Sequence, residues 1–517
     1  MSEIESFLKT ICDDKITIPK VYSKKVLTND TIKKLFSYQA PQVIRIISIL
    51  LTKYIALDAS DTGVGKTYSA CATCKELSRR PIIFCPKTLI FSWMCVLDFF
   101  GVKYYDIVNY ETIKNGKTYR NAKCKSRKKA FYLELVDPDP DDPMKSIYEW
   151  NVPDDAIIIF DEVHRCKNYK TDNGKLLAST KQLIQKKIPV LLLSATICEK
   201  IQDMKILFYL FGFIPNTRNY NHYLRTMRNK YPKYRIKKSD YPRKFDFIVA
   251  NENAQAMMIY EEIRDFTARI KIKDLGDKFP SNQFCAQMFF AEESDEISNA
   301  YEKIAAHMKA LKENPGSNHL AKIQKLKQEI EFRKVPIFIE QAQLYMDEGK
   351  SVIIFVNYLD TLEVLSLELN IRCKIHGSQT MQQRLEAIDL FQSNQERIII
   401  CQMRAGGVGI SLHDLHGGHP RVTLINYPDS AADLLQALGR APRAGAKTPV
   451  LQRIIFVANV EYEKRIMQNI NKKLANISAI NDGDLDGHKY KINKITRKVI
   501  KKNQPKDVDP DDIDLDE

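Results

Sequence analysis

The stretch that decides the fold is Ser60-Asp-Thr-Gly-Val-Gly-Lys-Thr67. It follows a short apolar run, Tyr54–Asp58, and precedes a helix-like segment from Tyr68 to Leu77. Glycines let such a loop curl until several backbone N–H groups point inward at phosphate oxygens, and the N-terminus of the next helix adds positive potential. The pattern therefore predicts a phosphate-binding loop formed by Gly63, Val64, Gly65, Lys66 and Thr67.

The two polar residues that end this loop have distinct expected roles. Lys66 would reach the β- and γ-phosphates of a nucleotide, and the Thr67 hydroxyl would bind Mg²⁺. The first glycine of the common pattern is Ser60 here, whereas the end from Gly63 to Thr67 is intact. Taken alone, the stretch leaves one alternative, a glycine-rich turn with an exposed lysine.

A second motif lies about a hundred residues downstream. The apolar run Ala156-Ile-Ile-Ile-Phe160 ends in Asp161-Glu-Val-His164, a DEAH-like box. A carboxylate at the C-terminal end of a parallel strand lies beside the phosphate loop in nucleotide-binding α/β folds. Asp161 is therefore expected to hold Mg²⁺, and Glu162 to orient and polarise the attacking water. The alternative is an acidic turn between a strand and a loop.

With these motifs in place, the sequence resembles superfamily 2 helicases and translocases. The box from Asp161 to Asn168, which ends in Lys-Asn, resembles the Swi/Snf-type branch. Supporting segments follow in the family's order over roughly residues 35–470: Tyr38-Gln39, Cys85-Pro86 with Leu89 and Trp93, Asn109-Tyr110-Glu111, Leu193-Ser-Ala-Thr196, His376-Gly377, Arg404–Leu412 and Gln436–Gly445. Ordered motifs across two domains are more specific than any one of them.

The resemblance implies a fold and a domain plan. Two RecA-like α/β domains, each a parallel sheet flanked by helices, would face each other across an ATP cleft. Apolar runs bounded by polar turns suit the buried strands of such sheets. They are Tyr54–Asp58, Ile82–Cys85, Ala156–Phe160 and Val190–Leu193 in the first half, and Val352–Val356, Ile398–Cys401, Val422–Asn426 and Arg453–Val457 in the second. The predicted units are an N-terminal segment (1–34), domain 1 (35–215), a basic and helical intervening region (216–334), domain 2 (335–475) and a basic, then acidic, disordered tail (476–517).

The resemblance also assigns further site residues. Tyr38 and Gln39 would lie on the adenine side of ATP. Gln436, Arg440 and Arg443 would act from the second domain, with the two arginines reaching the γ-phosphate. Their spacing would place them on one helical face, but Pro442 predicts that the helix ends near Arg440. His164, Ser194, Thr196, Gly407 and Gly409 would couple ATP to nucleic acid. The alternatives are a basic surface helix for the arginines and a helix cap formed by Ser194 and Thr196.

Composition excludes several classes of protein and indicates a polyanionic partner. The chain has 517 residues, a net charge of +15 and 11 cysteines. No run reaches the roughly 18 apolar residues of a membrane span, and the start, MSEIESFLKT, lacks a signal-peptide pattern. Odd, scattered cysteines indicate reduced thiols, so we expect an intracellular protein, cytoplasmic or nuclear. Usage rich in Lys, Ile and Asn fits an AT-rich genome, and large DNA viruses encode compact members of the family that the chain resembles, so a viral factory or virion is the other expected location.

Basic residues cluster in two internal stretches. Lys117 to Lys129 holds seven basic residues and no acid, and Arg218 to Lys244 holds ten with one acid and five interleaved tyrosines. The first could contact a phosphate backbone, form a surface loop or act as a localisation signal. The second could bind nucleic acid or form a solvated hairpin whose tyrosines pack on the core. A helical hairpin is predicted within residues 292–350, broken at 314–316.

These expectations converge on an ATP- and Mg²⁺-dependent helicase or translocase that acts on DNA, most simply double-stranded DNA, within transcription, replication or repair machinery. An RNA helicase or transcript-release factor is the alternative enzyme. An ATP-regulated scaffold that binds nucleic acid without turnover is the alternative from another class. Metal binding by Cys71 and Cys74, or by His413, His416 and His419, is a weaker prediction than structural thiols and a surface loop.

Overall fold

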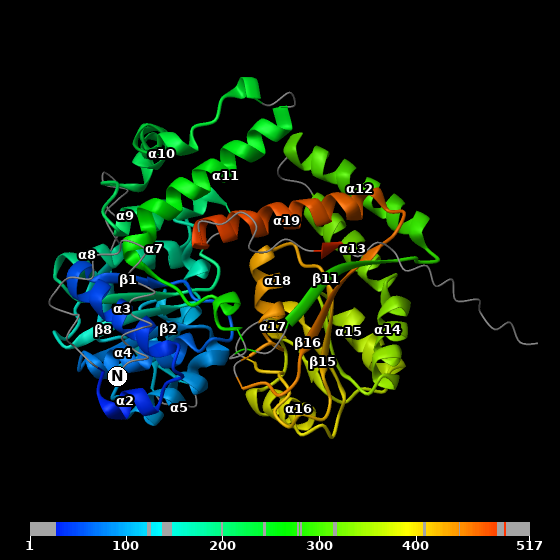
Figure 1. Cartoon of the computed structure of the whole chain (residues 1–517), viewed down its shortest axis with the longest axis horizontal. Coiled ribbons are helices and arrows are strands. Elements are labelled where there is room, and N and C mark those ends of the chain that lie inside the picture. Colours follow the sequence, from blue (N-terminus) through cyan, green and yellow to red (C-terminus); the bar gives the residue numbers. More distant parts are fainter. Residues whose placement is uncertain are drawn as a thin grey trace, which may run out of the picture.

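The computed structural model describes residues 27–120, 126–136, 147–197, 200–240, 244–276, 279, 282–313, 318–406, 410–443, 445–482 and 491–492. Within these ranges the chain forms two parallel sheets with helices around them, shown in blue to cyan and in yellow to orange in Figure 1. The predicted α/β fold, with two RecA-like domains, is confirmed.

The first sheet has six strands in the order β10-β1-β9-β8-β2-β3, and all printed pairings are parallel. The residues of β1, β8 and β9 are all buried, as expected for apolar runs covered on both faces. The strands are β1 (Ile55–Asp58), β2 (Arg80–Cys85), β3 (Asp106–Asn109), β8 (Ala156–Asp161), β9 (Val190–Leu193) and β10 (Thr267–Ala268). The helices of this half are α2 (Asn29–Lys33), α3 (Gln39–Lys53), α4 (Lys66–Glu76), α5 (Ile90–Phe100), α6 (Tyr110–Ile113), α7 (Asp172–Ser179), α8 (Lys181–Gln185) and α9 (Lys205–Leu210).

The second sheet has seven strands in the order β13-β14-β12-β15-β16-β11-β17, again parallel. Its strands are β11 (Asn282–Phe289), β12 (Ser351–Val356), β13 (Lys374–Ile375), β14 (Ile398–Gln402), β15 (Arg421–Asn426), β16 (Val450–Val457) and β17 (Lys491–Ile492). Its helices are α12 (Ser294–Glu313), α13 (His319–Phe332), α14 (Val335–Asp347), α15 (Leu359–Glu368), α16 (Met381–Gln392), α17 (Met403–Gly406), α18 (Ala431–Leu438) and α19 (Glu461–Asp482). The expected helical hairpin is formed by α12 and α13.

Two small antiparallel ribbons are inserted between α6 and β8. The first pairs β4 (Lys117–Tyr119) with β5 (Arg127–Lys129), and the second pairs β6 (Leu133–Leu135) with β7 (Tyr148–Trp150). Tyr132 and Tyr148 are fully buried, so the insertion is anchored in the core of the first domain.

The segment between the two sheets contributes to both of them. Strand β10 extends the first sheet beside β1, and β11 pairs along its whole length with β16 of the second sheet. The remainder of the predicted intervening region, 216–334, is mainly helical and includes α10 (Tyr220–Lys230) and α11 (Lys244–Ile263). The domain limits drawn from the sequence stay a prediction, and the sheets show that this region is not separate from the two domains.

The tyrosines of the Arg218–Lys244 stretch pack against the first domain. Tyr220 is fully buried, and its hydroxyl donates to the carbonyl oxygen of Ile201 at 2.6 Å. Tyr223 donates to Glu262 Oε2 at 3.1 Å, and Lys230 pairs with the same carboxylate at 2.6 Å. The described part of this stretch therefore favours the solvated hairpin over a base-stacking surface. Tyr241 lies outside the described residues.

A long helix of the second domain reaches over to the first. Figure 1 shows α19 in orange crossing toward α11 in green. Lys472 of α19 pairs with Glu252 of α11 at 2.9 Å. The two domains are thus joined by this helical contact in addition to the connecting chain.

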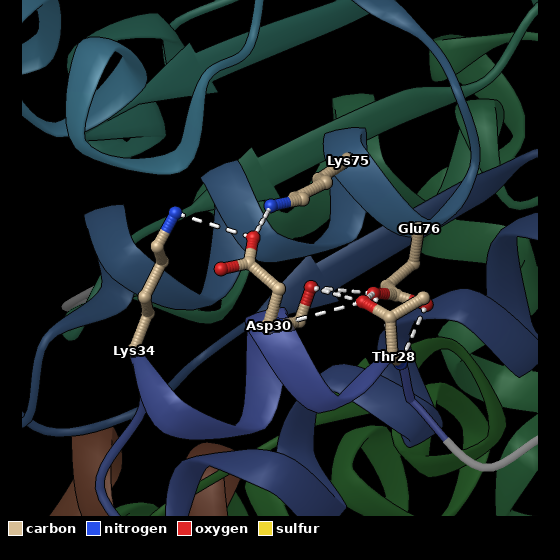
Figure 2. A network of polar contacts seen from close by, with 6 residues as sticks. Thr28, Asp30, Lys34, Lys75 and Glu76 are labelled. Carbon is tan, nitrogen blue, oxygen red and sulfur yellow. Dashed lines mark hydrogen bonds and ion pairs between the residues drawn. The ribbon is translucent and has the colours of Figure 1, made fainter.

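Helix α2, at the start of the described residues, is hydrogen-bonded to α4, the helix that follows the phosphate loop. Thr28 caps α2, and its hydroxyl also donates to Glu76 Oε1 of α4 at 2.6 Å (Figure 2). Asp30 pairs with Lys34 at 3.2 Å and with Lys75 of α4. Asp30 is exposed, so water screens its ion pairs and each of them is weak. The contacts of the network link α2 to α4. None of the described helices combines the length and low polarity needed to cross a bilayer.

We expect Lys334→Ala to destabilise the second domain strongly. Lys334 and Glu463 form an ion pair at 2.6 Å, with side chains that are 1% and 0% exposed. Removing the ammonium leaves a buried carboxylate uncompensated, which typically costs about 3–5 kcal/mol. Lys472→Ala, which breaks the partly exposed pair with Glu252, should cost less than about 1 kcal/mol. Urea unfolding followed by circular dichroism measures both, and equal effects would contradict the buried-charge argument.

Candidate active site between the two domains

The phosphate loop has the curled conformation that its glycines predict. It joins β1 to α4, and Gly63 and Gly65 have φ angles of +87° and +89°. Side chains other than glycine rarely adopt this region. A Cβ on Gly65 would also lie only 2.3 Å from Gln39 Nε2. The loop therefore needs glycine for both its backbone and its close neighbours.

Lys66 and the adenine-side residues all contact the loop. Lys66 Nζ donates to the carbonyl oxygens of Ser60 at 2.9 Å and Asp61 at 3.1 Å. Burial lowers the pKa of Lys66, while the charges of nearby acids, Glu162 first, oppose that shift. Gln39 Nε2 donates to the carbonyl oxygen of Val64 at 3.0 Å, and the buried Tyr38 ring packs beside Val64.

Ser60, which stands where the common pattern has glycine, forms part of a buried polar cluster. Its hydroxyl oxygen accepts from Gln42 Nε2 and from the backbone N–H of Ile270, both at 2.9 Å. Gln42 also donates to Asp58 Oδ1 at 2.9 Å, and burial raises the pKa of Asp58. Sequence reasoning missed this cluster, although a charged residue ending the apolar run of β1 was a signal for it.

The segment after β10 is hydrogen-bonded to the phosphate loop. The backbone N–H groups of Ala59 and Asp61 donate to Ala268 and Ile270 at 2.9 and 3.0 Å. The Asp61 carboxylate accepts from the Ile272 N–H and pairs with Arg269, both at 2.8 Å. Because this segment continues into β11, the loop is bonded to the chain that enters the second sheet.

The acidic box lies at the carboxyl end of β8, beside the phosphate loop. Asp161 is buried, its Oδ2 accepts from Trp93 Nε1 at 2.8 Å, and its carbonyl accepts from the Tyr110 hydroxyl at 2.6 Å. Glu162 has a φ of +56°, a left-handed conformation that costs about 1–2 kcal/mol outside glycine. Such strain persists only where the surroundings impose it, and the Glu162 carboxylate is held 3.3 Å from His164 Nδ1.

The surroundings of Asp161 and Glu162 shift the pKa values of their carboxyl groups in opposite directions. Burial, followed by the charge of Glu162, raises the pKa of Asp161. Burial acts in the same direction on Glu162, but the hydrogen bond and charge of His164, together with Lys66 and Arg440, hold the pKa of Glu162 below its usual range. Glu162 is therefore the more readily ionised member of the pair.

His164 joins three of the predicted motifs. Its Nδ1 lies 3.3 Å from Glu162 Oε2 and 3.1 Å from Ser194 Oγ, and its Nε2 lies 3.3 Å from Gln436 Nε2 of the second domain. Ser194 Oγ accepts from the backbone N–H of Thr196 at 3.3 Å. Lys200, rather than Ser194 or Thr196, precedes the next helical turn, so the capping alternative is not what the structure shows.

Gln436, Arg440 and Arg443 approach this edge from the second domain. Helix α18 ends at Leu438, so Gln436 lies on the helix and both arginines project from the turn after it. Gly439 is the C-cap with a φ of −86°, and because the helix ends before Arg440 the three residues do not share one helical face. Arg440 Nε donates to the Gln436 carbonyl at 3.0 Å.

Both guanidinium groups are held by the same carbonyl. Arg440 Nη1 and Arg443 Nη2 donate to the Ile410 oxygen at 3.3 and 3.0 Å. Burial lowers the pKa of Arg440 to about 10 and that of Arg443 to about 9, and the charge of Arg440 adds to the second shift. Gly407 and Gly409 lie outside the described residues.

The two domains touch at glycines. A Cβ on Gly439 would lie 1.9 Å from Thr62 Oγ1 and 2.4 Å from Thr62 Cβ. A Cβ on Gly63 would lie 3.0 Å from the Pro442 oxygen and 3.3 Å from Arg443 Cγ. The turn that carries the arginines therefore packs directly on the phosphate loop.

The residues present fit Mg²⁺ and a nucleotide. Mg²⁺ prefers oxygen ligands, and the Thr67 hydroxyl and Asp161 carboxylate supply them at adjacent ends of α4 and β8. Within the described ranges, no group of three or more His, Cys, Asp and Glu residues could hold a metal ion by itself. Cys71 and Cys74 are buried free thiols, and His419 Nδ1 contacts the Gly349 carbonyl at 2.8 Å. These findings favour structural thiols and a surface loop.

Comparisons with known proteins agree with this geometry. Residues 323–445 match the family described as "Helicase conserved C-terminal domain". A curated protein of Acanthamoeba polyphaga mimivirus, named "Putative ATP-dependent RNA helicase", is 62% identical over 495 residues, which are 95% of this chain and 92% of that protein. The chain belongs to the superfamily 2 ATP-dependent helicases.

More distant similarities were found to another curated protein and to solved structures. An "ATP-dependent rRNA helicase" of Encephalitozoon cuniculi is 26% identical over 42% of this helicase and 54% of its own length. Among solved structures, the Sulfolobus solfataricus Swi2/Snf2 ATPase core in complex with dsDNA is 17% identical over 87% of this chain and 94% of its own, with a TM-score of 0.31. S. cerevisiae Dbp5 bound to RNA and ADP BeF3 is 13% identical over 86% and 94%, with a TM-score of 0.40.

The contact between Gly439 and Thr62 yields a test of cleft closure. Gly439→Ala places a methyl group inside the Thr62 side chain, so closure should cost a few kcal/mol and turnover should fall about ten-fold or more, since 1.4 kcal/mol is ten-fold. Thr62→Gly should restore turnover in the double variant. Thr62→Ala, which keeps the Cβ, should not. Steady-state phosphate release measures all three, and rescue by Thr62→Ala as well would contradict the predicted Cβ clash.

Proposed function

We propose that this chain hydrolyses ATP in the cleft between its two domains and uses opening and closing of the cleft to move along, or separate the strands of, nucleic acid. The observation that carries the proposal is the bridge from Glu162 through His164 to Gln436, because it joins the acidic box of one domain to the arginine turn of the other. A nucleotide in this cleft would contact both domains at once.

Each side chain has a chemical role in this proposal. Lys66 and the loop N–H groups would hold the β- and γ-phosphates. Thr67 and Asp161 would hold Mg²⁺, which neutralises charge on the phosphates. Glu162, kept ionised by its neighbours, would orient the attacking water, and Arg440 and Arg443 would stabilise charge on the departing phosphoryl group. Tyr38 and Gln39 would lie beside the adenine.

RNA is the first substrate to test. Three curated relatives carry names of RNA helicases, and one of them is similar over nearly the whole chain. The expectation from sequence, movement on double-stranded DNA, rests on the Lys167-Asn168 ending of the acidic box. It stays a second candidate, as do the Swi/Snf-type branch and roles in transcription, replication or repair at an intracellular site.

The alternative from another class, a scaffold that binds nucleic acid, would not hydrolyse ATP. The grouping of Lys66, Asp161, Glu162 and Arg440 argues against it, because these are the side chains that hydrolysis needs.

We expect ATP turnover to rise several-fold on addition of nucleic acid, and more with RNA than with DNA of the same sequence. The physical reason is that a polymer bridging both domains favours the closed cleft, in which the arginines meet the phosphates. Phosphate release is measured with single- and double-stranded RNA and DNA. Greater stimulation by double-stranded DNA would support the translocase candidate, and no stimulation by any polymer would refute the proposal.

We expect Glu162→Gln to abolish turnover while ATP still binds. The amide keeps the shape of the side chain but cannot accept a proton from water, so hydrolysis should fall at least about a hundred-fold. Lys66→Ala is the contrasting variant, since loss of a phosphate contact should weaken ATP binding itself. Filter binding of labelled ATP and phosphate release separate the two effects. Normal hydrolysis by Glu162→Gln would remove this residue from its proposed role.

A further inference from the structure

The β4–β5 ribbon concentrates positive charge in a way that opposes its own stability. Its described residues include five basic side chains and no acidic one: Lys117, Arg120, Arg127, Lys128 and Lys129. All five are exposed. Lys117 and Lys129 are directly paired across the ladder, and like charges placed opposite each other destabilise a two-stranded ribbon.

Few carboxylates relieve this charge. Lys129 pairs with Glu134 at 2.5 Å, in a contact where both side chains are more than half exposed. Lys128 lies near Asp106, whose carboxylate is buried and already accepts hydrogen bonds from Thr118 and Tyr132. Among the residues that the structure describes, most of this positive charge has no carboxylate partner, and exposed positive charge of this kind is the electrostatic signature of a surface for a polyanion.

An exposed aromatic ring lies next to this charge. Phe131 follows β5 by two residues and is 54% exposed. Its ring makes edge-to-face contacts with Tyr105 and Tyr132, with centroids 6.0 and 5.1 Å away, so two neighbouring rings hold it in place while about half of the residue meets solvent. Cations beside a fixed, exposed aromatic ring form the combination by which proteins bind single strands, whose phosphates pair with the cations while an unpaired base stacks on the ring.

The ribbon is also fixed to the edge of the sheet that carries the active site. The Tyr119 hydroxyl donates to Asn109 Oδ1 at 2.7 Å, at the carboxyl end of β3. The next residue, Tyr110, donates to the carbonyl of Asp161. A polymer on the ribbon would therefore lie at the carboxyl edge of the first sheet, connected to the acidic box through two side chains.

We propose that the β4–β5 ribbon, together with Phe131, is a binding surface for single-stranded nucleic acid. The exposed lysines and arginines bind the phosphates, and Phe131 stacks on a base. This inference rests on the proposed function, and it names a surface of that function which none of the family motifs includes.

The test neutralises the ribbon without touching the ATP site. We expect Lys117→Gln, Arg127→Gln and Lys128→Gln together to raise the Kd for single-stranded RNA about ten-fold at low salt and to reduce the slope of log Kd against log salt by about two. ATP turnover without nucleic acid should not change. The matched control, Lys303→Gln with Lys309→Gln and Lys312→Gln on the exposed face of α12, alters net charge equally and should have a much smaller effect.

Phe131 separates base stacking from charge. We expect Phe131→Ala to weaken single-strand binding about ten-fold, which corresponds to about 1.4 kcal/mol for one stacked base, and to leave duplex binding nearly unchanged. Phe131→Trp should retain single-strand affinity. Fluorescence anisotropy with labelled single and double strands measures each variant.

The outcomes distinguish this inference from the proposed function. If wild-type turnover does not respond to nucleic acid, the proposed function fails. If wild-type turnover does respond, and the ribbon variant binds RNA as well as the α12 variant does, the ribbon is not the surface. Equal losses in both variants would likewise overturn the inference, because general electrostatics would then explain the binding.

Discussion

The structure depends on charged side chains from two domains that are buried together at one edge. Asp161 and Arg440 are each about 95% buried, and Glu162 is nearly so, with 12% of its side chain exposed. A lone buried charge costs several kcal/mol, and a counter-charge offsets part of that cost. Arg440 supplies such a charge to Glu162 from the other domain. Charges of opposite sign from the two domains meet at this edge. If the cleft opens and closes as proposed, a phosphate bound here would change the balance between the two states.

The chain that connects the two sheets is hydrogen-bonded to the phosphate loop. Residues 268–272 are hydrogen-bonded to the phosphate loop at Ala59, Ser60 and Asp61, and a few residues further on the chain enters β11 of the second sheet. Phe279 packs with Val64 of the loop and with Tyr38. A shift of the phosphate loop would therefore displace residues 268–272, whose backbone continues into the second sheet. Ser60 takes the place of the first glycine of the common pattern. Its hydroxyl oxygen accepts a hydrogen bond from the backbone N–H of Ile270, which a glycine could not do.

The sequence predicted the parts of the fold that depend on continuous apolar runs, and it missed those that depend on long-range pairing. All eight predicted strands are present because a fully buried parallel strand needs little beyond an unbroken apolar run. Strand β10 has two residues and exists only because β1 offers an edge, so no local pattern marks it. Likewise, the grouping of Lys66, Asp161 and Glu162 followed from motif order, whereas the contact of Gly439 with Thr62 depends on how two domains meet. The end of α18 at Leu438 agrees with the limit that Pro442 sets, since a proline at 442 cannot donate to the carbonyl of Leu438.

The two basic stretches differ in how their positive charge is surrounded. From the sequence, this charge indicated only that the protein binds some polyanion. In the Arg218–Lys244 stretch, α11 supplies carboxylates to two of the basic residues: Glu261 pairs with Lys233 at 2.7 Å, and Glu262 pairs with Lys230 at 2.6 Å. Its described tyrosines are occupied by the same carboxylates or by the core. In the β4–β5 ribbon, the ladder instead brings lysines face to face, and the neighbouring aromatic ring is exposed. A count of basic residues favours the Arg218–Lys244 stretch. The ribbon, however, combines its exposed lysines and arginines with an exposed aromatic ring, and that combination makes it the stronger candidate for a single strand.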